Sequence, residues 1–301
     1  MTENRILLAA FMIVIYAMII GFTDNFVRVI AEEIGLWQFH ATRTVMALII
    51  LGLAALPLGL RLRPVNLSAV VARSVIHGLA MVIYFGALAF LPVALVAAGL
   101  FTAPIFVLLI SRFAYGEAIG TLGIVAVALG FAGVVLVLGP EAWAGASLPA
   151  LLPVIGGALY AMGNVATRKW CPDESAETLL AGFFAALGVI GLIGMLALTL
   201  VPLAAAPGPE GFLQRGPVWP GGDVWFWTFV QAAGSLVAVG MMVRAYQIAD
   251  APRVSVFEYV ILPASALWSW ALWGEVLTPL SVLGMAMIVA AGVMIAVGRR
   301  D

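Results

Sequence analysis

Ionisable side chains inside long apolar segments are the residues of this sequence that could do chemistry. Glu258 lies between Phe257 and Tyr259 in an otherwise apolar stretch, and His77 lies well inside another. A charged group at membrane depth is costly and usually faces the interior of a helical bundle or a water-filled cavity. Glu258 there can carry a proton or bind a substrate ammonium, and His77 can titrate near neutral pH or hydrogen-bond a substrate carboxylate or amine.

Each of these groups also has an ordinary structural interpretation. Glu258 can form an ion pair with Arg244, and His77 can be a neutral buried histidine that is bonded to a backbone carbonyl. Asp24 and Arg28 are four residues apart and share a helix face, which favours a salt bridge at the outer end of that helix. The sequence leaves both interpretations of Glu258 and His77 open.

Aromatic side chains supply stacking surfaces and apolar walls for an organic ligand. The best placed of them are Tyr16, Tyr84, Phe101, Tyr160 and Phe257, for each of which ordinary core packing is the alternative. Asn164 and Gln231 add neutral hydrogen-bonding groups. This combination, with little buried charge, favours a small zwitterionic or weakly charged organic ligand over an inorganic ion.

The elements that must position these residues are membrane-spanning helices. The chain is 64% hydrophobic and 10% charged, whereas a soluble domain carries roughly 25% charged residues. A span needs about 20 apolar residues, and ten such segments follow one another. They cover approximately residues 6–30, 37–60, 68–91, 93–111, 119–138, 148–170, 177–203, 223–249, 253–273 and 279–297.

The ten predicted spans form two similar halves. The residues Ile15-Tyr16-Ala17-Met18 recur as Leu159-Tyr160-Ala161-Met162, and Pro104 and Glu117 recur as Pro263 and Glu275, which lie 159 and 158 residues later. We therefore expect a first repeat over residues 1–145 and a second over 146–301. Because five spans is an odd number, the second repeat enters the membrane upside down, and a central cavity forms where the halves meet.

Orientation follows from the arginines and lysine, which gather at one set of loop ends that we assign to the cytoplasm. Both termini are then cytoplasmic, and one chain already supplies both halves, so a monomer is sufficient.

The single cysteine, Cys171, excludes an intramolecular disulfide and lacks the partners that a zinc site needs. No phosphate-binding loop and no convergent catalytic set is present. We expect no enzymatic activity, no cofactor, no metal and no nucleic-acid partner.

The chain resembles the EamA family of the drug/metabolite transporter superfamily. The resemblance rests on the ten spans in two copies, on Arg43 in the second span, and on Pro104 with Gly116-Glu117, which Pro263 and Gly274-Glu275 mirror. It is greatest to bacterial exporters of aromatic and other neutral amino acids. It implies a basket-like bundle whose cavity is lined by spans one, three, four, six, eight and nine. The residues that it places in this cavity are Tyr16, His77, Tyr84, Phe101, Asn164 and Glu258.

One departure concerns the first span, where this family often has a tryptophan and this chain has Tyr16. We predict a multi-pass transporter of the bacterial inner membrane that exports amino acids or similar small metabolites by alternating access, in contact with the lipid bilayer. The substrate-binding residues that we predict are Tyr16, His77, Tyr84, Phe101, Tyr160, Asn164 and Glu258. The alternative function is export of hydrophobic cations as drugs, with Glu258 balancing their charge.

Overall fold

The regular elements of the computed structural model are helices throughout the residues that it describes, which are 3–87, 91, 93–139, 149, 151–274 and 278–297. The first half contains α1 (Glu3–Asp24), α2 (Val27–Glu33), α3 (Leu36–Leu58), α4 (Leu67–Ala87), α5 (Val93–Leu100), α6 (Ala103–Phe113) and α7 (Thr121–Leu138). The second contains α8 (Leu151–Lys169), α9 (Ala176–Leu200), η3 (Gly208–Gly211), α10 (Gly222–Ile248), α11 (Ala251–Phe257), η4 (Glu258–Val260), α12 (Ile261–Trp273) and α13 (Pro279–Val297). Glu275 and the predicted repeat boundary at residue 145 lie outside the described residues.

Within these ranges, nine helical segments are long and apolar enough to cross a membrane. The prediction of an all-helical membrane protein is therefore confirmed. The predicted sixth span corresponds to α8, which is not among the nine. It carries Asn164, Thr167 and Arg168 and packs against α4, α5, α6 and α10, so these helices cover much of its surface. A helix that is largely covered by protein does not need the uniform apolar surface of a lipid-facing one.

Three of the spans that were predicted from the sequence are interrupted in the structure. The first breaks between α1 and α2, where the Asn25 side chain donates to the Gly21 carbonyl at 2.6 Å and so competes with the helical backbone bonds. The fourth breaks between α5 and α6, just before Pro104, and the ninth passes through the 3-10 turn η4, just before Pro263. A proline lacks the N–H of a helical bond and clashes with the carbonyl four residues back.

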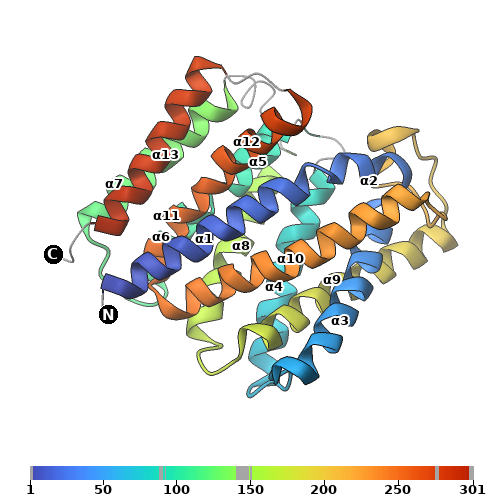
Figure 1. Ribbon diagram of the computed structural model, residues 1–301, viewed down its shortest axis with the longest axis horizontal. Coiled ribbons are helices and arrows are strands. Elements are labelled where there is room, and N and C mark those ends of the chain that lie inside the picture. The colour runs from blue at the N-terminus through green and yellow to red at the C-terminus, as the bar shows by residue number, and fades with distance from the viewer. Residues whose placement is uncertain are drawn as a thin grey trace.

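Close helix contacts depend on glycine. An added Cβ at Gly133 of α7 would lie 2.6 Å from the Gly284 carbonyl of α13, and one at Gly284 would lie 2.5 Å from the Gly133 carbonyl. In lipid, small residues let backbones approach, because association depends on van der Waals contact. In Figure 1, α7 and α13 lie side by side at one end of the bundle and α3 and α9 at the other, with α1 and α10 across the middle.

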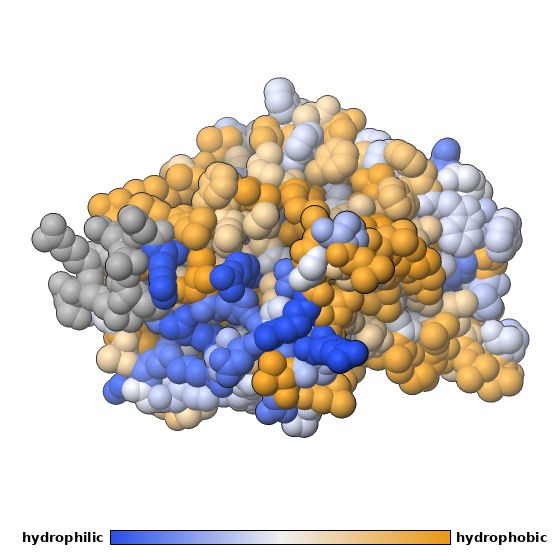
Figure 2. Space-filling model, turned by 60° about the horizontal axis from the view of Figure 1, so that its bottom comes forward, coloured by the Kyte–Doolittle hydropathy of each residue, from blue (hydrophilic) through white to orange (hydrophobic). Residues whose placement is uncertain are grey.

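Large apolar side chains cover much of the outside of the bundle. Leu53, Leu56 and Phe113 are 74%, 91% and 81% exposed. Figure 2 shows hydrophilic residues gathered in a strip with hydrophobic surface on both sides. A soluble monomer rarely exposes so much contiguous apolar surface, whereas lipid would cover it.

We predict that Gly157→Ala lowers the apparent melting temperature of the purified protein in detergent. The new Cβ would lie 2.7 Å from the Gly99 carbonyl at the break between α5 and α6, and overpacking of this kind costs about 1–3 kcal/mol. Gly52→Ala is the matched control, because an added Cβ at Gly52 of α3 meets nothing within 4 Å. Equal melting temperatures for the two variants would contradict this account of the packing.

Candidate functional site

The candidate site is a cavity of about 470 Å³ in the middle of the bundle. Its walls come from the first, third, fourth, sixth, eighth and ninth spans, as the family resemblance implied, and also from α3, α7, α9 and α13. Apolar and aromatic side chains make up most of the lining. Its polar residues are Tyr16, Asp24, Asn25, Arg43, Arg73, His77, Tyr84, Tyr160, Gln231, Ser235, Glu258, Ser265, Ser269 and Ser281.

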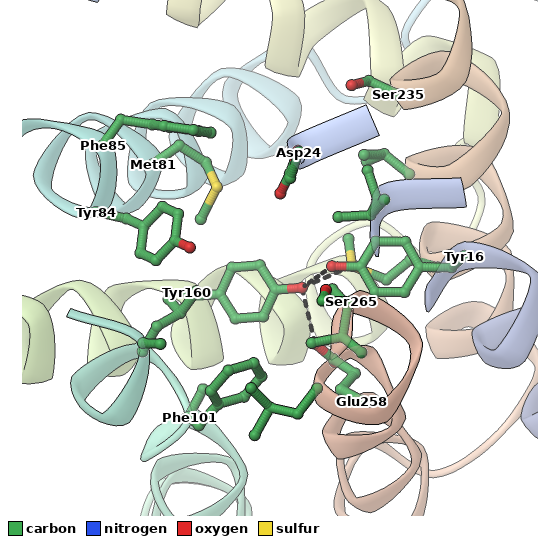
Figure 3. A pocket seen from close by; sticks show the side chains of 18 of the residues that line it. Tyr16, Asp24, Met81, Tyr84, Phe85, Phe101, Tyr160, Ser235, Glu258 and Ser265 are labelled. Atoms are coloured by element: carbon green, nitrogen blue, oxygen red, sulfur yellow. Dashed lines mark hydrogen bonds between the residues drawn. The ribbon is translucent and has the colours of Figure 1, made fainter. Parts of the chain in front are cut away.

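Glu258 is the centre of a buried hydrogen-bonded cluster at one wall. Its Oε2 accepts from the Tyr160 hydroxyl at 2.8 Å, and its Oε1 accepts from Asn164 Nδ2 at 3.1 Å and from the Tyr246 hydroxyl. The Tyr160 hydroxyl also lies 3.3 Å from that of Tyr16 (Figure 3). A buried carboxylate is tolerated only when its oxygens are hydrogen-bonded, and three donors meet that condition here.

The local backbone explains how Glu258 reaches this position. It is the first residue of η4, so the helix axis shifts at the residue that carries the carboxylate. Glu258 is 7% exposed and lines the cavity. The alternative ion pair with Arg244 is not formed, because Arg244 is exposed on α10 and donates to Gln247 at 3.4 Å. The partners of Glu258 are instead tyrosines and an asparagine from α8 and α10.

His77 and Arg73 line the cavity from α4. The His77 ring lies edge-on to Tyr160, with the centroids 4.9 Å apart, and it is 2% exposed. Among the described residues, neither His77 ring nitrogen has a hydrogen-bond partner, so the alternative of a bond to a backbone carbonyl is not observed. Arg73 is also buried, and its Nε donates to the Thr167 hydroxyl of α8 at 2.9 Å.

Six of the seven residues that the sequence predicted therefore line the same cavity. Asn164 stands one layer behind and reaches the site through its bond to Glu258. Tyr84 and Phe101 both contribute to the aromatic wall, with the Tyr84 hydroxyl pointing into the cavity (Figure 3). The fold thus brings these residues together from α1, α4, α8, η4 and the break after α5.

A second polar cluster was missed by the sequence analysis. Gln231 of α10 accepts from Arg43 Nη1 at 3.0 Å and from the Ser235 hydroxyl at 2.7 Å, and its Nε2 donates to Asp24 Oδ1 at 2.7 Å. The sequence predicts no contact among these residues and favours a salt bridge between Asp24 and Arg28. The Arg28 guanidinium instead lies over the Trp273 ring, 3.7 Å from its centroid.

One signal in the sequence could have found this cluster. Arg43 and Gln231 lie about 9 Å and about 12 Å inside the predicted outer ends of their spans, at the 1.5 Å rise per residue of an α-helix. Asp24 lies at a similar predicted depth, near the outer end of the first span. Polar residues at one depth on different spans are candidates for a shared cluster, because each must find a partner inside the protein.

Comparison with known proteins shows that this chain is similar to transporters. Residues 7–139 match the model of the EamA-like transporter family. A riboflavin transporter of Rhizobium johnstonii is 28% identical over 227 residues, which cover 74% of this chain and 68% of that protein. A pseudopaline exporter of Pseudomonas aeruginosa is 23% identical, with coverage of 77% and 76%. An uncharacterised transporter of Helicobacter pylori is 22% identical over 98% of this chain and 96% of its own length.

A solved crystal structure shares the fold, with a TM-score of 0.78 over 98% of both chains at 19% sequence identity. At that identity the likeness describes the architecture alone.

We predict that Glu258→Ala lowers the apparent melting temperature far more than Tyr16→Phe does. The alanine leaves the hydroxyls of Tyr160 and Tyr246 and the Asn164 amide without their acceptor, and each unsatisfied buried group costs about 1–3 kcal/mol. Tyr16→Phe removes only a hydroxyl from the 3.3 Å contact with Tyr160. Thermal unfolding in detergent measures both variants, and similar losses would show that Glu258 is not the acceptor for this cluster.

Proposed function

We propose that this chain, whose residues 7–139 belong to the EamA-like transporter family, is a secondary transporter that exports amino acids or similar small metabolites. The observation that carries the proposal is the central cavity, which combines aromatic walls with two polar clusters, one around Glu258 and one around Gln231. Its volume of about 470 Å³ falls within the roughly 300–1,000 Å³ of small-molecule sites. The relatives are named as transporters, which points away from an enzyme.

An inverted repeat is the architecture that we propose for it. α1 packs on α10 and α8 packs on α4, which pairs the first span with the eighth and the sixth with the third. α3 packs on α9 and α7 on α13, which pairs the second with the seventh and the fifth with the tenth. Exchanging the two five-helix halves leaves this set of pairs unchanged. The breaks before Pro104 and Pro263 also fall at corresponding places in the halves.

Alternating access is the transport mechanism that this architecture favours. The cavity reaches Val137, Leu138 and Ser281, at the predicted outer ends of α7 and α13. At the predicted cytoplasmic end, Lys169 pairs with Glu117 at 2.6 Å and Arg168 with Asp250 at 3.0 Å. These contacts tie α8 to the loops that adjoin the fourth and ninth spans. The arrangement fits a conformation in which the cavity is open to the outside and closed to the cytoplasm. We place the protein in the inner membrane with both termini cytoplasmic.

The charges around the cavity help to rank the substrate classes. Asp24 and Glu258 are matched by Arg43 and Arg73 among the described residues that line it. A formally balanced cavity favours a zwitterionic or uncharged substrate over the hydrophobic cations of a drug exporter. A second candidate is a larger heteroaromatic metabolite, because one relative is named a riboflavin transporter and the aromatic wall offers stacking surfaces.

Uptake into liposomes that contain the purified monomeric chain tests this function. The panel holds labelled neutral and aromatic amino acids, riboflavin as the heteroaromatic candidate, and ethidium as a hydrophobic cation. We expect uptake of amino acids above that of empty liposomes. Uptake of riboflavin alone would favour the second candidate, and uptake of ethidium alone would favour the drug exporter.

We further propose that protonation of His77 or Glu258 couples transport to a proton gradient. Both residues are buried and line the cavity, so a change in their charge would be felt by the substrate. We expect His77→Ala or Glu258→Gln to remove the pH dependence of uptake and to lower its rate by at least about tenfold, the equivalent of about 1.4 kcal/mol. Gly52→Ala serves as the folded control. Variants with the pH profile of the parent would overturn the coupling proposal.

A further inference from the structure

The two carboxylates of the cavity differ in how many donors already reach them. The Glu258 oxygens accept from Tyr160, Tyr246 and Asn164. A carboxylate offers about four lone-pair positions, so three of those on Glu258 are already filled. Asp24 accepts one hydrogen bond, from Gln231 Nε2 to Oδ1, and within the described part of the chain no donor reaches its Oδ2.

The position of Asp24 in α1 adds the negative end of a helix dipole to its own carboxylate. Asp24 is the last residue of the 22-residue helix α1, whose C-terminal end carries the negative pole of the helix dipole. A carboxylate at that pole is unfavourable by itself and gains from a cation beside it. In Figure 3 its carboxylate and the Tyr84 hydroxyl point into the same space. A hydroxyl oxygen beside a carboxylate offers a second acceptor to an ammonium group, which has three N–H donors.

The buried cation Arg43 does not bind the Asp24 carboxylate directly. The Arg43 guanidinium is 4% exposed, lies 4.9 Å from the Phe39 ring centroid, and reaches Asp24 only through Gln231, which bridges the two. Among the described residues, Arg43 and Asp24 form no direct ion pair within 4.0 Å. Asp24 is therefore oriented by a neutral amide and keeps one oxygen for a ligand.

We propose that Asp24, oriented by Gln231, is the subsite that receives a cationic or N–H donor group of the substrate, and that Glu258 is not its direct partner. The inference rests on the proposed transport function and names one chemical requirement of the substrate, a primary ammonium or an equivalent N–H donor. Glu258 instead holds the hydroxyls of Tyr160 and Tyr246 in place and shapes the opposite wall.

Three probes that share one ring test the subsite: phenethylamine carries an ammonium, phenylalanine carries an ammonium and a carboxylate, and 3-phenylpropionate carries a carboxylate only. Binding to the purified protein is measured by ligand-induced thermal stabilisation. We expect Asp24→Asn to weaken the two ammonium probes at least about tenfold and to leave 3-phenylpropionate unchanged. Asp24→Glu retains the charge and should retain most of the affinity. Equal weakening of all three probes, or a selective loss in Glu258→Gln instead, would overturn the proposal.

A second measurement separates failure of the subsite from failure of the proposed substrate class. Cys171 is the only cysteine, so Cys171→Ser gives a background without thiols. Ser265→Cys in that background places a reporter on the cavity wall near Asp24. An added Cβ at Gly21, one turn before Asp24, would lie 2.9 Å from the Ser265 backbone nitrogen.

The reporter is labelled in detergent with a cationic and an anionic methanethiosulfonate reagent, and the ratio of the two rates is compared. We expect Asp24→Asn to lower the preference for the cation by about tenfold and Asp24→Glu to preserve it. An unchanged ratio in Asp24→Asn would overturn the subsite. A lowered ratio with no binding of any phenyl probe would uphold the subsite and show that the amino-acid-like substrate class is wrong.

Discussion

The charged side chains that line the cavity of this membrane-spanning bundle depend on partners within the protein, because lipid offers none. Glu258 meets this constraint through Tyr160 and Asn164 of α8 and Tyr246 of α10. Arg43 meets it through Gln231, and Arg73 through Thr167. Most of these bonds join spans that are far apart in the sequence. The hydrogen-bonding requirement therefore fixes which helices must face one another and leaves a polar cavity where they meet.

Glycine and proline allow the helices to satisfy that requirement. Gly163 of α8 leaves room for the His77 ring, which an added Cβ would approach to 2.5 Å, and Gly157 does the same for the break after α5. The interruptions before Pro104 and Pro263 change the helix direction next to the cavity, and one of them carries Glu258. Close helix packing and broken helices thus have the same effect, because both bring backbone and polar side chains to the centre of the bundle.

The resulting cavity has two polar places with different roles. At one, a carboxylate that already accepts three hydrogen bonds holds two tyrosine hydroxyls in position. At the other, a carboxylate with an unused oxygen stands at the negative end of a helix beside Tyr84. A transporter must bind its substrate from either side and release it again, which favours a few well-placed contacts over an enclosing set. The aromatic walls supply the rest of the contact area.

The sequence by itself determined the class of this protein, because about 20 apolar residues per span and the shortage of charge leave a membrane bundle as the only economical interpretation. It also identified Tyr16, His77, Tyr84, Phe101, Tyr160 and Glu258 as cavity residues, since polar and aromatic groups inside apolar spans face inward. Only the tertiary structure decided which partners they find. Glu258 binds tyrosines rather than Arg244, and Asp24 turns toward Gln231 while Arg28 lies over Trp273. Such pairings depend on how the helices are rotated against one another, which contacts between distant spans decide and local sequence does not. The breaks themselves lie beside Asn25, Pro104 and Pro263 and so do have a local signal.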